Sequence, residues 1–145
     1  MKISRTVSYA IQATIQLARA GGDAPTPCSR LAAEGEMPER FLLQILRNLV
    51  RHGILESTRG VDGGYRLVRN ADSISLLEII EAIDGPLKPG LAPRRGLPED
   101  VEQNLIRSLE SVTALCRREL EAIKISSLMM SRDEVDAAER ASSQP

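Results

Sequence analysis

The chain has 145 residues, 42% of them hydrophobic, and its 19 basic and 20 acidic side chains give a net charge of −1. This length supports one modest core with an extra element outside it. Two cysteines and one histidine are too few for a disulfide framework or a zinc site and leave little equipment for catalysis, so we expect neither an enzyme nor a bound metal.

Positive charge is concentrated in the first half of the chain. Residues 1–70 carry 10 basic and 6 acidic side chains, a net of +4, whereas residues 71–145 carry 9 and 14, a net of −5. Because phosphate binding depends on local positive charge, this division favours a first half that faces DNA, although a surplus of four also fits ordinary scatter. The sequence has no run of 18 apolar residues and no cleavable leader, so we expect a cytoplasmic protein with no membrane partner.

Three helices are predicted before the first glycine-rich hairpin. An apolar face recurs at helical spacing from Ile3 to Ala18 and predicts a first helix of the core. Thr26 and Pro27 have the residue types of an N-cap and a first helical position, so we expect a short second helix to open there. Pro38 starts a third helix, with an apolar face of Phe41, Leu42, Ile45, Leu46, Leu49 and Val50.

A β-hairpin is predicted directly after the third helix. Residues 54–58 and 65–69 are its strands, and the tip between them is rich in glycine. Helix, turn, helix and arginine-bearing hairpin form the plan of a winged helix, whose commonest work is reading duplex DNA. We therefore expect residues 1–85 to form a winged helix–turn–helix DNA-binding domain, and the fold to be mainly α with a small β-hairpin.

Candidate DNA-binding residues follow from this plan. Side chains near the N-terminal end of a helix in the major groove distinguish base edges; a glutamine suits adenine and an arginine suits guanine or a phosphate. Arg59 at the hairpin tip suits a narrow minor groove, and tip glycines allow close approach to a phosphate, although they also fit a simple tight turn. The candidates, each of which also fits a solvated surface, are Lys2, Arg5, Pro38, Glu39, Arg40, Leu43, Gln44, Arg47, Arg59, Gly60, Gly63 and Gly64.

The second half of the chain predicts a dimerisation element. Ser75 and Glu78 form a capping box for a fourth helix, and the proline-rich residues 86–97 are an expected linker. A helix from Pro98 carries an apolar stripe about six turns long that needs a cover, for which a second copy is favoured over the chain's own domain. Residues 98–130 are thus a dimerisation helix with a short contact segment, and residues 131–145 a flexible tail. The expected dimer contacts are Leu105, Leu109, Val112, Cys116, Leu120 and Ile123.

Several ordered segments together resemble the Rrf-two (Rrf2) family of bacterial transcriptional regulators. They are Tyr9-Ala10, 41–46, 53–55, Arg59-Gly60 with 63–67, and 74–80. The resemblance implies a homodimeric winged-helix protein, usually a repressor, whose long helices cross and whose paired motifs bind a near-palindromic operator.

The chain departs from this family at two places. Members that bind an iron–sulfur cluster carry three cysteines in the segment corresponding to residues 85–98, which has none here, so we predict no cluster and no other cofactor. Leu43 stands where some members have a glutamate that discriminates bases. Because leucine accepts no hydrogen bond, we expect a different operator preference, such as contact with thymine methyl groups.

Two alternatives remain open on the sequence. Cys28 and Cys116 fit small buried apolar residues, but Cys116 lies on the stripe of the long helix and could approach its symmetry mate and respond to oxidation. Because no sensor for a small molecule or metal is visible, the winged helix could also be a protein-interaction module, or a regulator controlled by a partner protein. Salt-dependent binding to random duplex distinguishes DNA binding from protein docking.

Overall fold

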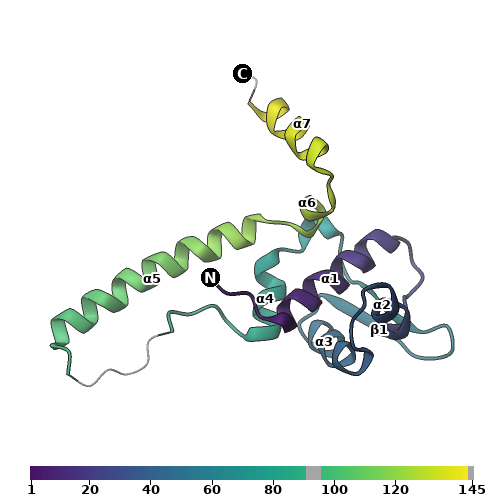
Figure 1. Ribbon diagram of the computed structural model, residues 1–145, viewed down its shortest axis with the longest axis horizontal. Helices are drawn as coiled ribbons and strands as arrows, with labels where there is room; N and C mark the ends of the chain where they lie inside the picture. Colours follow the sequence, from purple (N-terminus) through teal and green to yellow (C-terminus); the bar gives the residue numbers. More distant parts are fainter. Residues whose placement is uncertain (91–95, 144–145) are drawn as a thin grey trace.

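The computed structural model describes residues 1–90 and 96–143. It confirms the predicted fold class, since its secondary structure is mainly helical with one two-stranded antiparallel sheet. Figure 1 shows a body formed by the first four helices and the hairpin, from which α5 projects. The elements in order are α1 (Arg5–Ala20), α2 (Cys28–Glu34), α3 (Glu39–Arg51), β1 (Leu55–Thr58), β2 (Gly64–Leu67), the 3-10 turn η1 (Ala71–Ser73), α4 (Leu76–Asp84), α5 (Glu99–Ala122), α6 (Ile125–Met129) and α7 (Arg132–Ser142).

The main core lies between α1, α2, α3, α4, α6 and the start of the hairpin. Helix α1 begins at Ser4, whose hydroxyl accepts a hydrogen bond from the N–H of Val7 at 3.1 Å. Its buried face meets α3, whose own buried face is made of Leu42, Ile45, Leu46 and Leu49. Phe41 departs from the predicted apolar face because it is 45% exposed. Its ring packs against that of Tyr9 in a T-shaped arrangement, with ring centroids 6.0 Å apart.

Three predicted helix starts differ from the structure by one residue. Pro27, Pro38 and Pro98 are the N-caps of α2, α3 and α5 rather than their first helical residues. The expectation that Thr26 caps α2 is wrong, because its backbone forms an antiparallel bridge with Tyr65 of β2 instead. The hairpin also shifts slightly: Leu55 pairs with Leu67 and Thr58 with Gly64.

Helix α4 joins the domain to α5. Its predicted capping box is present, since Ser75 accepts from the N–H of Glu78 and Glu78 accepts from the N–H of Ser75. A second apolar cluster consists of Val7, Leu77, Ile80 and Leu120, so α1, α4 and the last turn of α5 pack together. The end of α5 is therefore part of the body.

The tail contains a helix that the sequence interpretation does not include. Within residues 131–145, which we expect to be a flexible tail, Arg132–Ser142 form α7, which begins with a second capping box at Ser131 and Glu134. Figure 1 shows α7 projecting away from the body. Of the expected linker over 86–97, residues 91–95 lie outside the described residues.

Candidate nucleic-acid interface

Helix α3 separates its residues into a buried side and an exposed side. The buried side holds the apolar residues of the core, whereas Arg40, Gln44 and Arg47 are exposed. In the part of the chain that the structure describes, neither arginine has a carboxylate within 4.0 Å, in contrast to Arg30, which pairs with Glu34 on α2. Unpaired guanidinium groups on an exposed helix face are available to a phosphate or a guanine base.

Three further candidate DNA-binding residues lie at or near the N-terminal end of α3. Pro38 and Glu39 are both exposed at the first turn. The Glu39 carbonyl accepts a weak hydrogen bond from the Cys28 thiol at 3.8 Å, which ties this turn to the start of α2. Leu43 is half-buried and follows the core residue Leu42, so only part of its side chain reaches the outer surface.

The structure brings α3 and the wing, which is the hairpin of β1, β2 and their connecting tip, together at one cleft of about 430 Å³. Arg47 lines it from α3, and Arg59 with three glycines lines it from the tip. Arg59 is exposed and has no carboxylate within 4.0 Å among the described residues. Five of the twelve candidate DNA-binding residues thus meet at this cleft: Arg47, Arg59, Gly60, Gly63 and Gly64.

Close packing inside the protein accounts for two of the tip glycines. A Cβ atom on Gly63 would lie 2.2 Å from the Thr58 carbonyl oxygen, and one on Gly64 would lie 2.3 Å from the Thr26 carbonyl oxygen. Glycine at position 63 therefore allows the tip of the wing to close, and glycine at position 64 allows β2 to approach Thr26, which precedes α2. Gly60 is different: it has a φ of +112° and open space around its Cβ position, so it remains available for approach by a phosphate.

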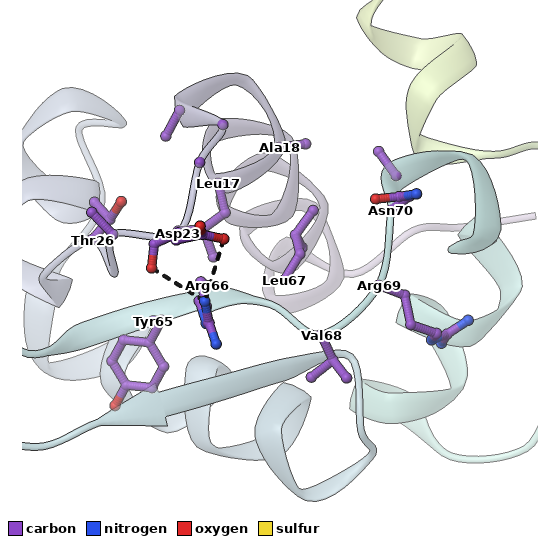
Figure 2. Close-up of a pocket in the computed structure, with 15 residues that line it drawn as sticks. Leu17, Ala18, Asp23, Thr26, Tyr65, Arg66, Leu67, Val68, Arg69 and Asn70 are labelled. Carbon is purple, nitrogen blue, oxygen red and sulfur yellow. Dashed lines mark hydrogen bonds and ion pairs between the residues drawn. The ribbon is translucent and has the colours of Figure 1, made fainter.

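The base of the wing is attached to the loop after α1. Arg66 on β2 forms an ion pair with Glu56 on β1. It also donates a hydrogen bond to the carbonyl of Asp23 at 3.2 Å, as Figure 2 shows. These contacts border a cavity of about 330 Å³ between the end of α1 and β2. Arg66 is therefore committed to holding the wing and is poorly placed to bind DNA.

Lys2 and Arg5 are exposed at the beginning of α1. Tyr9 lies one turn after Arg5 on the same face of α1 and contacts Phe41 in the first turn of α3. Arg5 therefore lies on the face of α1 from which Tyr9 contacts α3. Lys2 precedes the helix, and its position is less closely tied to α3.

The candidate dimer residues fall into two groups on α5. Val112 is 56% exposed and Leu105 36% exposed, while Leu109, Cys116 and Ile123 are half-buried. Leu120 is only 5% exposed because it packs in its own chain's second cluster, so it is a poor dimer contact. The sequence interpretation missed Ile106 and Leu115, exposed by 36% and 54%, which widen the apolar surface on either side of the predicted stripe.

Cys28 and Cys116 lie on separate elements, α2 and α5, and both are half-buried free thiols. Burial, and secondly the negative charge of Glu39, raise the pKa of the Cys28 thiol above its ordinary value. A neutral thiol is a weak nucleophile, which supports the packing interpretation for Cys28.

Comparison with known proteins decides the family. The family model "Rrf2: Iron-dependent Transcriptional regulator" matches residues 3–131. The chain belongs to the Rrf2 family. CymR of Bacillus subtilis, an HTH-type transcriptional regulator, is 35% identical over 89 residues, which are 61% of this chain and 64% of CymR. The solved structure of this global cysteine regulator has a TM-score of 0.69 and 26% identity, covering 89% of this chain and 96% of that one.

Rv1287 of Mycobacterium tuberculosis H37Rv is 39% identical over 87 residues, 60% of this chain and 54% of Rv1287. The alignments therefore span little more than half to just under two thirds of these relatives' lengths. CymR is named as an HTH-type transcriptional regulator, which agrees with the prediction of a transcriptional regulator.

The donor set of this Rrf2 protein does not fit the iron that the family description implies. Its cysteines are Cys28 and Cys116, its only histidine is His52, and residues 85–98 contain neither type. Within residues 1–90 and 96–143, His, Cys, Asp and Glu form no group of three able to hold a metal ion. Cluster ligation requires thiolates or imidazoles that converge on one point. The described residues therefore do not form a site for an iron–sulfur cluster.

Among the residues that the structure describes, no helix combines the length and the apolar character that crossing a membrane requires.

Proposed function

We propose that this Rrf2 protein is a sequence-specific DNA-binding transcriptional regulator that acts in the cytoplasm as a homodimeric repressor on a near-palindromic operator. The observation that carries the proposal is the shared cleft at which Arg47 of α3 and Arg59 of the wing lie together. One arginine comes from the helix expected in the major groove and the other from the hairpin expected at the adjacent minor groove.

Base recognition is assigned to the exposed side of α3. Gln44 can bond adenine through two hydrogen bonds, and Arg40 or Arg47 can do the same with guanine. Glu39 at the first turn can accept from cytosine, and the exposed part of Leu43 can contact a thymine methyl group. Each correct bidentate pair contributes about 1–3 kcal/mol of discrimination.

Dimerisation is assigned to the apolar surface of α5. Exposed apolar residues in a contiguous patch usually mark an interaction site, and those of α5 lie on the part that projects from the body. A second copy related by a two-fold axis would cover this surface with the same surface of its own. Two DNA-binding domains related by such an axis would bind an inverted repeat, which is why the operator is expected to be near-palindromic. The resemblance to Rrf2 regulators supports repression.

Three measurements on the purified protein test the proposal. Fluorescence anisotropy with a random duplex between 50 and 200 mM salt should show a log affinity that falls linearly with log salt concentration, because phosphate contacts release counterions. Selection from a duplex library should then return an inverted repeat. Light scattering should give twice the chain mass of 15.9 kDa.

A monomer that ignores duplex at low salt would overturn the proposal. Salt-insensitive capture of a protein partner without duplex binding would instead favour the protein-interaction module.

A further inference from the structure

An ionic and hydrogen-bonded junction connects α4, the segment after Gly85, and α5. Glu81 on α4 pairs with Arg117 on α5 through both carboxylate oxygens; the second contact, from Nη2 to Oε2, measures 3.5 Å. The same carboxylate accepts a hydrogen bond from the N–H of Leu87 at 2.8 Å. Arg117 also reaches the Leu87 carbonyl at 3.4 Å. Three segments therefore meet at two side chains.

Glu81 is well held in this junction. Its side chain is 24% exposed and that of Arg117 is 40% exposed. Partial burial by itself would raise the pKa of Glu81, but the hydrogen bonds from Leu87 and Arg117 outweigh it and lower the pKa. The carboxylate is therefore ionised and paired at neutral pH. An Arg–carboxylate contact made through two oxygens fixes orientation as well as distance.

A separate contact holds the end of α5. The N–H of Leu76 donates to the Ile123 carbonyl and the N–H of Ile125 donates to the Ile74 carbonyl, both at 2.9 Å. These backbone bonds and Leu120 attach the last turn of α5 beside α4. Because these contacts all lie at one end of α5, they do not fix the direction of the helix axis. Arg117 lies nearly one turn before Leu120 and supplies a second fixed point.

The length of α5 makes its direction important. From Arg117 back to Glu99 the helix extends over 18 residue steps, or about 27 Å at 1.5 Å per residue. A tilt of about 10° at Arg117 would move the far end by about 5 Å, more than the 3.4 Å step of one base pair along a strand. In a dimer joined through α5, such a tilt would change the separation of the two DNA-reading heads.

We propose that Glu81 and Arg117 are positioning residues that set the angle between α5 and the DNA-reading domain, and thereby the half-site spacing that the dimer prefers. This inference rests on the proposed function, since it requires both dimerisation through α5 and binding to an inverted repeat. Neither residue touches DNA in this scheme.

The test uses the full chain and operators obtained by selection with the wild-type protein. Affinity is measured for the selected operator and for versions with one base pair added or removed between the half-sites. We expect Glu81→Gln and Arg117→Gln each to reduce the wild-type preference for the selected spacing by at least about threefold. The double variant should be no worse than either single variant, because the two residues act as one unit.

Two further measurements separate positioning from general damage. Binding to a single half-site and the dimer mass should stay at wild-type values in both variants. Arg118→Gln is the matched control, because Arg118 is an exposed neighbour on α5 with no carboxylate within 4.0 Å in the described structure, and its spacing preference should be unchanged. If one variant fails to fold, the other still provides the comparison.

Retention of the wild-type spacing preference by a folded, dimeric Glu81→Gln or Arg117→Gln protein would overturn the inference. Weaker binding to all spacings by the same factor would also overturn it. If the wild-type protein itself fails to dimerise or to select an inverted repeat, the proposed function fails instead.

Discussion

The N–H of Tyr65 donates to the carbonyl of Thr26 at 2.8 Å, and the N–H of Thr26 donates to the carbonyl of Tyr65 at 2.9 Å. This pair of bonds attaches the second strand of the wing to the residue before α2. Since α2 packs against α3, this attachment connects the wing to the reading helix through α2. The cleft lined by Arg47 and Arg59 depends on this attachment.

Gly64→Ala should loosen the wing, because the added Cβ would lie 2.3 Å from the Thr26 carbonyl oxygen. We expect a loss of about 1–3 kcal/mol in the free energy of unfolding, with weaker DNA binding. Urea unfolding and anisotropy provide the two measurements. Gly90→Ala is the control, because a Cβ there would meet nothing within 4 Å. Wild-type stability of Gly64→Ala would show that the close contact is not required.

Arg59→Ala should weaken DNA binding without unfolding the protein, because Arg59 is exposed and unpaired in the described structure. Losing one phosphate contact should lower the magnitude of the slope of log affinity against log salt by about 1. Anisotropy titrations at several salt concentrations give this slope. Arg19→Ala is the control, because Arg19 is an exposed arginine in the last turn of α1. This substitution should leave the slope unchanged. An unchanged slope for Arg59→Ala would remove the wing arginine from the DNA contact.

Val112→Glu and Leu120→Ala should fail in different ways. Val112 is 56% exposed in the single chain, so a charge there should dissociate the dimer while each chain stays folded. Leu120 is buried against its own domain, so Leu120→Ala should lower the free energy of unfolding by about 2–5 kcal/mol. Light scattering and urea unfolding separate these results. The control Ala114→Glu adds the same charge on the opposite face of α5 and should leave the dimer intact. A stable dimer in Val112→Glu would refute the proposed interface.

Glu78→Ala should remove a pH-dependent part of the stability. Partial burial would raise the pKa of Glu78, but hydrogen bonds from Ser75 and Arg69 outweigh it and hold the pKa below its ordinary value. Stabilisation of this sign is complete above the unfolded-state pKa of about 4.3 and is lost as pH falls through the folded-state pKa. At pH 7 we expect Glu78→Ala to be less stable by about 1 kcal/mol, as for loss of a helix cap.

Urea unfolding from pH 7 to pH 3 checks this sign. The difference between wild type and Glu78→Ala should narrow as the solution becomes acidic. Glu139→Ala on α7 should show no such trend. A difference that stays constant over this range would contradict the assignment to the Glu78 carboxylate.

Oxidation distinguishes the two interpretations of Cys116. If the α5 helices cross near this residue, mild oxidant should produce a disulfide-linked dimer in the Cys28→Ser variant and none in Cys116→Ser. Non-reducing gels report the outcome. If Cys28→Ser gives a monomer band and no dimer band, Cys116 is a half-buried packing residue.

Local patterns predicted most elements of this fold, and contacts between distant segments account for the differences. The capping box at Ser75 was visible because its partners are three residues apart, and the same signature at Ser131 could have predicted α7. The Thr26 bridge could not be predicted, because its partner Tyr65 lies in a later strand. Periodicity placed Leu120 on the α5 stripe but could not show that α4 covers that end.

The candidate interface shows the same division. Helical spacing identified Arg40, Gln44 and Arg47 as the exposed side of α3, and the structure agrees. The sequence could not separate tip glycines needed for packing, Gly63 and Gly64, from Gly60, because the distinction depends on neighbouring carbonyl groups.

The uncovered apolar surface of α5 has a consequence for gene dosage. If only paired chains occupy an operator, the concentration of the active species at low expression rises with the square of the amount of polypeptide made, by mass action. Halving synthesis would then remove about three quarters of the dimer. Regulated promoters would therefore respond more than proportionally to a change in translation.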